Sequence, residues 1–554
     1  LFISAAILPI GTMASETEEG LPLVVEVEVP SISRTWDPVS LLYDDQFHDS
    51  AEVDEEIENI HSSVPELVDV EVIGQSYQGK NITSIRITNE QNTVQKAKTL
   101  VVAHHHGREQ ITVEMALRFI LRLLNGYGVD ATLTEYIDTQ EIYVILTINP
   151  DALDVVVNEG NHWLRKNLRP FDNDLDGLFG EDDAEDVDGD GYISEFTVYI
   201  KDYPTENPGI LDYDYYYYEG IDNDLDGQVN EDEVGLVDLN RNYPNWWEDG
   251  DTDETTQVYR GTEPFSEPET QAFRNFALNH SFAMSYSLHS GINATFFTAD
   301  GGGNWQVPTL YYQIASDYTD ILPSSYNDLA GYPVGESRIE SALAGGWGEW
   351  MYMERGCTVP ITFEIYTNAS VHADEATFII EENSTHIIRE WKGIYGYFNP
   401  VEEAINSLWN DLYAAFDYLL EMTPRIDFDA TSITGGVNAG ENVTITLNME
   451  CLSPRLGSKD GISVLSESGE AIDSLIAVGA AQTIVNYPSI TLSEDLDSSG
   501  IVILVGCNYT GYTQFVVSTG GNLPPMDPLL LVAGIGLVVA LVAIVVVVYR
   551  KKSP

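Results

Sequence analysis

The stretch "VVAHHHGREQITVEMALRF", residues 101–119, places three consecutive histidines between an apolar run and an amphipathic segment. The apolar run begins earlier, as "KTLVVAHHH", and has the nearly continuous hydrophobicity of a buried strand. The residues after the histidines predict a helix closed by Gly126. Because open α/β sheets place their sites at the carboxyl ends of strands, the histidines mark a candidate site.

Spacing distinguishes the three histidines. Only His106 has an acidic residue three positions later, Glu109, whereas His104 and His105 do not. Zinc hydrolases commonly combine two histidines with one carboxylate and leave a fourth position for water. A lone His-x-x-Glu pair is weak evidence for such a site. His289, at the end of the predicted strand "FAMSYSLHSG", is a candidate third ligand, although it is equally compatible with a hydrogen-bonded core residue.

Strand and helix patterns alternate from about residue 45 to residue 425. The segments "KNITSIRIT", "EIYVILTINPD" and "VPITFEIYTN" predict further strands, and "EVDEEIENIHSSVP" and "PVEEAINSLWNDLYAAFDYLLEM" predict helices. We expect an α/β fold with a mixed, mostly parallel sheet and helices on both faces. Residues 426–520 change to short β-rich runs divided by Gly, Asn and Ser, which predicts a separate small β-sandwich domain.

The composition is strongly acidic. The 554 residues include 25 Lys and Arg against 89 Asp and Glu, a formal net charge of −64. Such a surface repels nucleic acid and anionic lipid headgroups and favours cation binding, so no nucleic-acid partner is expected. Only three cysteines occur, which excludes a disulfide scaffold. A Cys451–Cys507 bridge and three unpaired thiols are both compatible with the sequence.

The two ends of the chain predict its location. Residues 1–15 resemble the apolar part of a signal peptide and precede an acidic lead-in, residues 16–44. After a linker at 521–528, residues 529–549 are apolar enough to predict a transmembrane helix, and the tail 550–554 is basic. By the positive-inside rule the tail is cytoplasmic. We therefore expect a single-pass cell-membrane protein of unknown oligomeric state with an extracellular body.

Further motifs follow His106 and Glu109 in a fixed order. They are Asn149-Pro150-Asp151, Arg165-Lys166, "DLNRN" with Asp238, Asn240 and Arg241, then His289-Ser290, and Glu364 in "ITFEIY". In this series the chain resembles the zinc carboxypeptidases of the carboxypeptidase A type. The resemblance covers roughly residues 45–425 and implies a carboxypeptidase-like catalytic domain there.

The resemblance also implies roles for these residues. One catalytic Zn²⁺ is expected on His106, Glu109 and His289, with Asp238 behind His106. Glu364 is expected to be the general base and Arg165 the group that stabilises the oxyanion. The expected substrate-binding residues are Asn240, Arg241 and Arg108. Together they imply hydrolysis of the C-terminal peptide bond of extracellular peptides or proteins.

Two departures from the family concern substrate binding. The family usually has a mobile tyrosine about nine residues before an acidic-Trp pair, and counting back from Glu349-Trp350 reaches Ser341 instead. This puts the clamping of substrate in doubt, but leaves the reaction class unaffected. Gly348 falls near the position that sets side-chain preference, and its lack of charge disfavours selectivity for Lys or Arg ends.

An insertion over residues 170–236 contains three Asp-x-Asp-x-Asp-Gly loops. This spacing is typical of Ca²⁺ loops, so the insertion predicts structural Ca²⁺ bound in isolated turns. Loop two ends in Thr197 and would need Glu195 or another donor. An acidic loop without an ion is the alternative. The expected ligands are Asp172, Asp174, Asp176 and Asp183 in loop one, Asp186, Asp188 and Asp190 in loop two, and Asp222, Asp224, Asp226 and Glu233 in loop three.

Two other functions remain compatible with the sequence. A zinc amidohydrolase acting on cell-wall or modified peptides could use the same fold, but Arg165 and the Asn240-Arg241 pair argue for substrates with a free carboxylate. A non-catalytic, Ca²⁺-stabilised surface-binding protein is the other alternative. The complete set of expected ligand and base residues argues against it.

Overall fold

The computed structural model describes most of the region before residue 424 and the strands beyond it. Residues described are 32–44, 46–92, 96–172, 177, 179, 183–201, 213–223, 230, 234–297, 314, 317–318, 320–322, 343–357, 359–368 and 377–423, together with the backbone of the strands between 426 and 517. The expected signal segment, linker, transmembrane helix and tail lie outside these residues, as does Ser341. No described helix is both long and apolar enough to cross a membrane.

A seven-stranded sheet forms the centre of the main domain, in the order β1-β2-β4-β3-β7-β9-β8. Its strands are β1 Val68–Gln75, β2 Asn81–Ile87, β3 Ala97–Ala103, β4 Gln140–Ile145, β7 Phe282–His289, β8 Ile292–Phe297 and β9 Val359–Tyr366. Strands β4, β3, β7 and β9 run parallel to one another, and β1, β2 and β8 pair antiparallel at the edges. The α/β fold with a mixed sheet is confirmed, with the parallel part confined to the four central strands.

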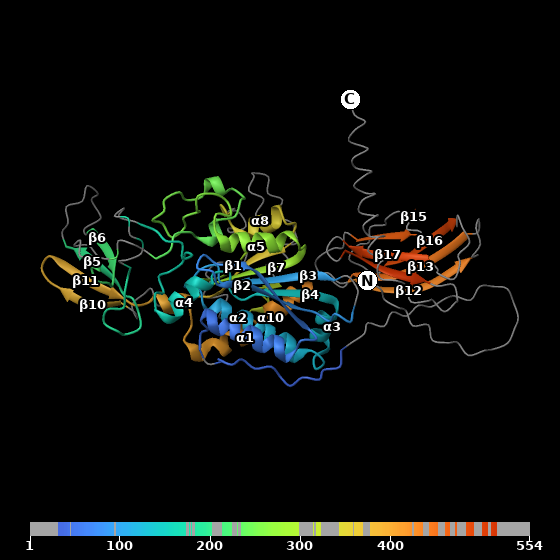
Figure 1. Cartoon of the computed structure of the whole chain (residues 1–554), viewed down its shortest axis with the longest axis horizontal. Helices are drawn as coiled ribbons and strands as arrows, with labels where there is room; N and C mark the ends of the chain where they lie inside the picture. Colours follow the sequence, from blue (N-terminus) through green and yellow to red (C-terminus); the bar gives the residue numbers. More distant parts are fainter. Residues whose placement is uncertain are drawn as a thin grey trace, which may run out of the picture.

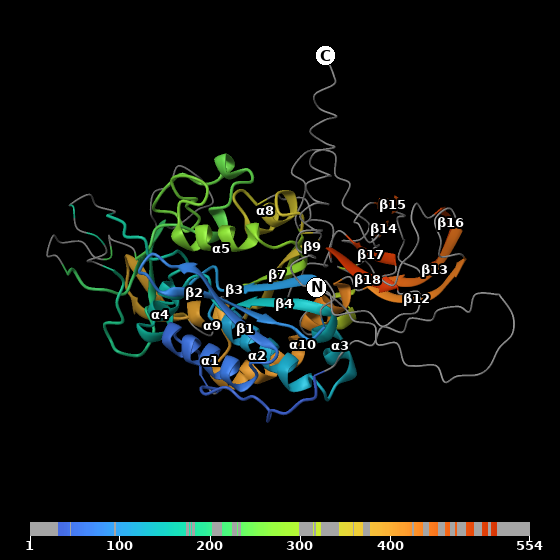
Figure 2. The ribbon, with the colours of Figure 1, turned by 45° about the vertical axis from the view of Figure 1, so that its right-hand side comes forward.

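Helices cover both faces of this sheet (Figures 1 and 2). Helices α1, α2, α3 and α10 lie on one face, and α5 and α8 lie on the other. Strand β3 is buried almost throughout, which explains why its sequence is apolar without alternation. The helices are α1 Ser50–Ser63, α2 Ile111–Gly126, α3 Ala131–Thr139, α4 Pro150–Asn158, α5 Pro268–Leu278, α8 Trp347–Met353, α9 Ile394–Phe398 and α10 Ile405–Met422, with 3₁₀ turns η1 Leu239–Arg241, η2 Trp247–Asp249 and η4 Glu402–Ala404.

The register of the parallel strands aligns their carboxyl ends. Ala103, the last residue of β3, pairs with Leu288 of β7. His289, the next residue of β7, pairs with Glu364 of β9. The histidines after β3, His289 at the end of β7 and Glu364 near the end of β9 are therefore brought to one edge of the sheet.

A second sheet joins two segments that are distant in the chain, in the order β10-β11-β5-β6. Strands β5 Glu195–Ile200 and β6 Tyr213–Tyr218 come from the insertion, whereas β10 Thr377–Glu382 and β11 His386–Trp391 lie between β9 and α9. We call this antiparallel sheet the rim sheet; it lies at the left in Figure 1. The sequence predicted isolated turns in the insertion and gave no sign of this pairing.

Residues 426–517 form two antiparallel sheets, with the orders β12-β13-β16 and β15-β14-β17-β18. Their strands are β12 Ile426–Gly435, β13 Asn442–Cys451, β14 Asp460–Leu465, β15 Ala471–Asp473, β16 Thr483–Thr491, β17 Ile501–Cys507 and β18 Gly511–Val517. The packing of these sheets as a sandwich stays a prediction. The choice between a Cys451–Cys507 bridge and unpaired thiols stays open, because it concerns side chains outside those described.

A buried ionic cluster ties the segment just before α1 to helices α1 and α2. His48 is 1% exposed, and its Nδ1 lies 2.9 Å from Glu114 of α2, while its Nε2 lies 3.4 Å from Glu56 of α1. Glu114 also accepts a hydrogen bond from Arg118 at 3.1 Å. Burial alone would lower the pKa of His48, but the hydrogen bonds that its ring donates to the two carboxylates outweigh burial and raise this pKa to about 9.

We therefore expect a pH-dependent contribution of His48 to stability. The folded-state pKa lies above the unfolded value of about 6.5, so the stabilisation is complete below about pH 6.5 and is lost as the pH rises through about 9. Its size is on the order of 3 kcal/mol. The measurement is the free energy of unfolding of the wild type and of His48→Asn, each at about pH 6.5 and about pH 9. An equal difference between the two proteins at both pH values would contradict this role.

Candidate metal centre and substrate cavity

The three consecutive histidines have different surroundings. His104 follows β3 with a positive φ of 62° and lies 2.9 Å from Thr147 Oγ1 and 2.8 Å from the carbonyl oxygen of Gly107. His105 lies 3.1 Å from Ser287 Oγ and 3.2 Å from the hydroxyl of Tyr243. Burial lowers the pKa of His104 to about 4 and that of His105 well below its usual range. Both are therefore neutral, hydrogen-bonded core residues.

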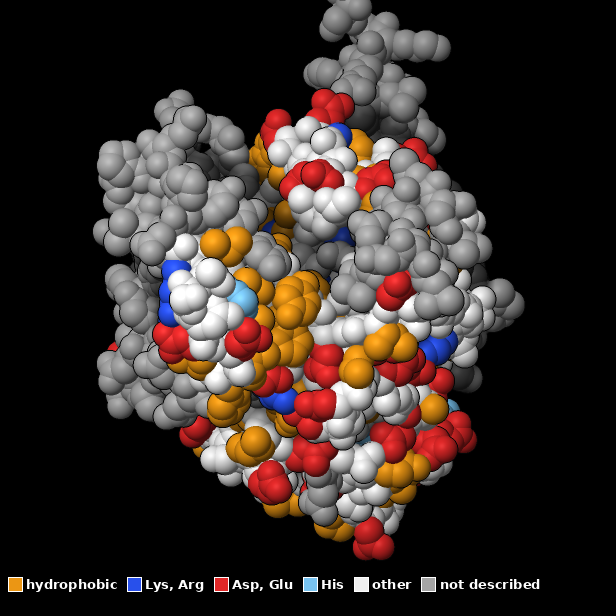
Figure 3. Space-filling view, turned by 90° about the vertical axis from the view of Figure 1, so that its left-hand side faces the viewer, with side chains coloured by type: hydrophobic (Ala, Val, Ile, Leu, Met, Phe, Trp, Pro, Cys, Tyr) orange, Lys and Arg blue, Asp and Glu red, His pale blue; other side chains and the backbone are white. Residues whose placement is uncertain are grey.

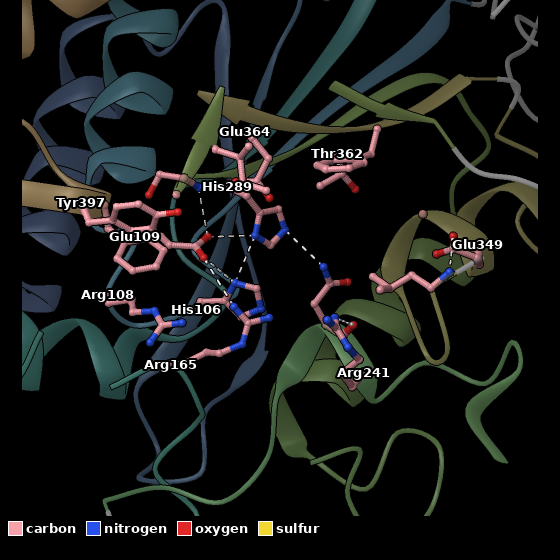
Figure 4. Close-up of a pocket in the computed structure, with 18 residues that line it drawn as sticks. His106, Arg108, Glu109, Arg165, Arg241, His289, Glu349, Thr362, Glu364 and Tyr397 are labelled. Carbon is pink, nitrogen blue, oxygen red and sulfur yellow. Dashed lines mark hydrogen bonds and ion pairs between the residues drawn. The ribbon is translucent and has the colours of Figure 1, made fainter. Parts of the chain in front are cut away.

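His106 alone of the three points into the cavity, where it meets Glu109 and His289 (Figure 4). Its Nδ1 lies 2.7 Å from Glu109 Oε1, and Nδ1 of His289 lies 2.9 Å from Glu109 Oε2. The two Nδ1 atoms are 3.2 Å apart. One donor atom from each residue lies within 4.8 Å of the others, and all three side chains are buried. Two imidazole nitrogens and one carboxylate form the donor set of a catalytic zinc site, so these residues fit Zn²⁺.

Asp238 lies behind this cluster and has no exposed surface. Its Oδ1 is 3.1 Å from His106 Nε2, and its Oδ2 accepts hydrogen bonds from Arg165 Nε and Nη2 at 3.0 and 2.8 Å. Burial alone would raise the pKa of Asp238, but the charges of Arg165 and Arg241 hold this pKa well below its usual range. A carboxylate that accepts a hydrogen bond from Nε2–H of His106 favours the tautomer in which Nδ1 carries no proton and is directed at the cavity.

The same aspartate begins the turn that carries Asn240 and Arg241. Oδ1 of Asp238 accepts the backbone N–H of Asn240 at 2.8 Å, which caps η1. Asn240 is held on its other side, where its Oδ1 accepts the backbone N–H of Trp347 at 2.9 Å. Gly345 packs against this turn at a positive φ of 69°, and a Cβ there would lie 1.9 Å from the carbonyl oxygen of Arg241. Only glycine permits this approach.

The residues meet in one cavity of about 320 Å³. Arg108 and Tyr397 lie on one side of the His106–Glu109–His289 cluster, and Arg241 and Glu349 lie on the other (Figure 4). The cavity is lined by His106, Arg108, Glu109, Arg165, Asn240, Arg241, His289, Ser290, Gly291, Ile292, Phe296, Leu343, Gly348, Glu349, Thr362, Glu364, Tyr397 and Phe398. All the residues expected from the sequence to act at zinc or substrate line it, except Asp238, which supports it from behind.

Several cavity residues were not expected from the sequence. Tyr397 and Phe398 come from α9, whose segment "YGYFNP" carries no metal or acid–base pattern. The Arg108 guanidinium lies 4.4 Å from the centre of the Phe398 ring. Burial, followed by the charge of Arg165, lowers the pKa of Arg108 to about 10, so Arg108 remains charged at neutral pH. Thr362 lies two residues before Glu364 in β9, so both side chains point to the same face of the sheet, and both reach the cavity.

The expected Ca²⁺ loops are described in part. In loop two, carboxylate oxygens of Asp186, Asp188 and Asp190 lie within 4.8 Å of one another. Lys392 Nζ lies 3.5 Å from Asp188 and also contacts Asp190. Asp172, Asp183 and Asp222 are described as parts of the other loops, whereas Asp174, Asp176, Asp224, Asp226 and Glu233 lie outside the described residues.

Loop two also has an acidic neighbour that the sequence did not suggest. The expected extra donor, Glu195, lies on β5 opposite Trp391. Glu219 instead contacts the loop, because its Oε1 accepts the backbone N–H groups of Val187 and Asp188 at 2.9 and 3.0 Å.

Comparison with known proteins identifies the family. The sequence profile of the zinc carboxypeptidases matches residues 53–414, and the chain belongs to this family. It is 31% identical over 127 residues to a zinc carboxypeptidase of Saccharothrix mutabilis subsp. capreolus, a match covering 22% of this chain and 29% of that protein. It is 30% identical over 128 residues to the inactive metallocarboxypeptidase ECM14 of Saccharomyces cerevisiae, covering 22% and 30%. The chain thus spans less than a third of either relative.

Among solved structures, thrombin activatable fibrinolysis inhibitor (TAFI) is similar at 18% identity and a TM-score of 0.47. The match covers 70% of this chain and 77% of that one.

The contacts of Asp238 predict its effect on metal affinity. Asp238→Asn should weaken Zn²⁺ binding about 10- to 100-fold, because the ring of His106 loses the carboxylate that fixes its tautomer. The measurement is competition for Zn²⁺ against a chromophoric chelator. Asp154→Asn is the control, because Asp154 pairs with Lys80 outside the cavity. Equal affinities of wild type and Asp238→Asn would show that other contacts set the tautomer.

Proposed function

We propose that this protein is a zinc-dependent metallocarboxypeptidase that releases the last residue of peptides with a free C-terminal carboxylate. One observation carries the proposal. A two-histidine, one-carboxylate cluster shares a single cavity with the carboxylate of Glu364 and the guanidinium groups of Arg165 and Arg241. A cluster that fits Zn²⁺ and guanidinium groups suited to bind a carboxylate thus line the same cavity, as the proposed reaction requires.

In this proposal Arg241 and Asn240 bind the substrate terminus. A guanidinium group suits bidentate binding of a carboxylate, and the amide of Asn240 can donate a further hydrogen bond. The Arg241 side chain is 18% exposed, and its Nη1 donates to the carbonyl oxygen of Asn240 at 2.9 Å. Such anchoring orients the last peptide bond over the cluster and thereby selects an exopeptidase reaction.

Glu364 and Arg165 then act on the bound peptide. When bound, Zn²⁺ acts as a Lewis acid that makes a water molecule acidic enough to lose a proton near neutral pH. Glu364 accepts that proton at its carboxylate and delivers it to the nitrogen of the leaving amine. Arg165 donates hydrogen bonds to the carbonyl oxygen as negative charge develops on it, while Asp238 holds the guanidinium in place.

The test compares two peptides that are identical except that one ends in a carboxylate and the other in an amide. We expect release of the last residue from the free acid alone, with loss of activity when a chelator removes Zn²⁺. Glu364→Gln should lower kcat by about 10²- to 10⁴-fold at similar peptide affinity, because it removes the general base but keeps the shape of the side chain.

Each of the other outcomes favours another function. Hydrolysis of both peptides would favour an amidohydrolase. If the folded, zinc-loaded protein hydrolyses neither peptide across varied C-terminal residues, the non-catalytic binding function is favoured; one relative is itself named an inactive metallocarboxypeptidase.

We further propose that loop two binds Ca²⁺. The convergence of Asp186, Asp188 and Asp190 supports it, as does the positive φ of 92° at Gly191, which turns the backbone toward these carboxylates. Calcium titration calorimetry on the zinc-loaded protein should give binding that Asp188→Asn removes. Chelation of Ca²⁺ with EGTA should increase cleavage of the insertion by added protease. No heat of Ca²⁺ binding and unchanged cleavage would show that loop two does not bind Ca²⁺.

A further inference from the structure

The rim sheet is connected to the cavity through Trp163. Arg108, on the cavity wall, donates its Nη1 to the carbonyl oxygen of Trp163 at 3.4 Å. The Trp163 ring lies 4.5 Å from the ring of Tyr218 on β6 and 5.5 Å from the ring of Trp391 on β11, measured between centroids. Its Nε1 donates to the carbonyl oxygen of Ile193, just before β5, at 3.0 Å. One residue therefore contacts both the cavity wall and the rim sheet.

Strand register assigns residues to the two faces of this sheet. Residues paired directly across antiparallel strands point to the same face, and neighbours along a strand point to opposite faces. Trp391 pairs with Glu195, which pairs with Tyr218, so this row lies on the face that packs against Trp163. We call it the Trp163-side face.

The next row on the same face has exposed hydrophobic residues at its two ends and half-buried residues between them. It runs from Ile379 through Arg389 and Thr197 to Tyr216. Tyr216 is 66% exposed and Ile379 is 59% exposed. The ring of Tyr216 lies 6.1 Å from that of Tyr218, so this row continues directly from the row that contacts Trp163. Figure 3, which looks at this end of the molecule, shows hydrophobic side chains near the centre of the view.

The direction of the substrate follows from the cavity. Arg241 lies on one side of the cluster, and Arg108 and Tyr397 lie on the other (Figure 4). A peptide with its terminal carboxylate on Arg241 and its last peptide bond over the cluster must extend toward Arg108. Arg108 contacts Trp163, and Trp163 in turn contacts Tyr218 and Trp391 on the Trp163-side face.

We propose that the Trp163-side face of the rim sheet binds the part of a polypeptide substrate that precedes the scissile bond. This inference rests on the proposed carboxypeptidase function and adds a substrate class to it: polypeptides with an apolar segment upstream of the C-terminus, in preference to very short peptides. Exposed Tyr216 and Ile379 supply apolar contacts to such a segment, and aromatic side chains give large contact areas at low cost in side-chain entropy. Strands β5 and β6 from the insertion and strands β10 and β11 from the segment between β9 and α9 both contribute to this surface.

The test uses the full chain and peptides that share their last four residues or so and differ in N-terminal length, from about four to about twelve residues. With an apolar extension, kcat/KM should rise about ten-fold over the series, whereas a Gly-Ser extension should have little effect. Tyr216→Ala should lower kcat/KM of the longest apolar peptide about three- to ten-fold and leave that of the shortest unchanged. Ile379→Ser should act in the same direction.

Matched controls lie on the opposite face. Tyr217 neighbours Tyr216 and stacks on Phe196, and Phe378 neighbours Ile379. Tyr217→Ala and Phe378→Ser should leave the length dependence as in the wild type. A kcat/KM independent of length, or equal losses for short and long peptides in Tyr216→Ala, would overturn the proposal.

Direct binding separates this proposal from the proposed function. Fluorescence anisotropy of labelled long and short peptides on Glu364→Gln measures binding without hydrolysis. If no peptide is cleaved but the long apolar peptide binds more tightly, and Tyr216→Ala in the same background removes the difference, the carboxypeptidase function fails while the surface assignment stands. Cleavage without any difference in peptide affinity refutes only the surface assignment.

Discussion

The buried carboxylate of Asp238 is the contact on which the rest of the site depends. It accepts hydrogen bonds from Arg165, lies within hydrogen-bond distance of His106, and caps the turn that bears Asn240 and Arg241. A buried charge is costly unless it is paired and hydrogen-bonded, and here two oxygens serve three groups. A single side chain thus holds in place both a candidate metal ligand and the groups expected to bind the substrate.

The register of the central sheet provides the second constraint. Parallel strands bring their carboxyl ends to one edge, and the pairing of His289 with Glu364 fixes two functional side chains at the same level. A slip of one residue would turn either side chain to the opposite face of the sheet. Backbone pairing buried on both faces therefore sets the distances between these groups, and the loops contribute the remaining residues.

The sequence predicted the parts that are encoded locally. The apolar run before His104, the spacing of His106 and Glu109 and the order of the later motifs indicated an α/β fold and a set of residues that the structure gathers in and around one cavity. The sequence did not indicate the hydrogen-bond partners of His104 and His105. Thr147, Ser287 and Tyr243 come close to these histidines only in the folded chain. The rim sheet escaped prediction for the same reason: strand pairing between distant segments leaves no periodic signal in either segment.

The rim sheet also bears on the order of assembly. Ser194 and Glu390 at its inner end form a hydrogen bond across 196 positions of the chain. Closing so long a loop is entropically costly unless intervening structure has already brought the ends together. Strand β9 and helix α4 are anchored in the central domain, so the catalytic edge can form before the strands beyond it meet. Folding would then form the candidate metal centre first and add the rim sheet last, so changes in the rim sheet need not disturb the assembly of that centre.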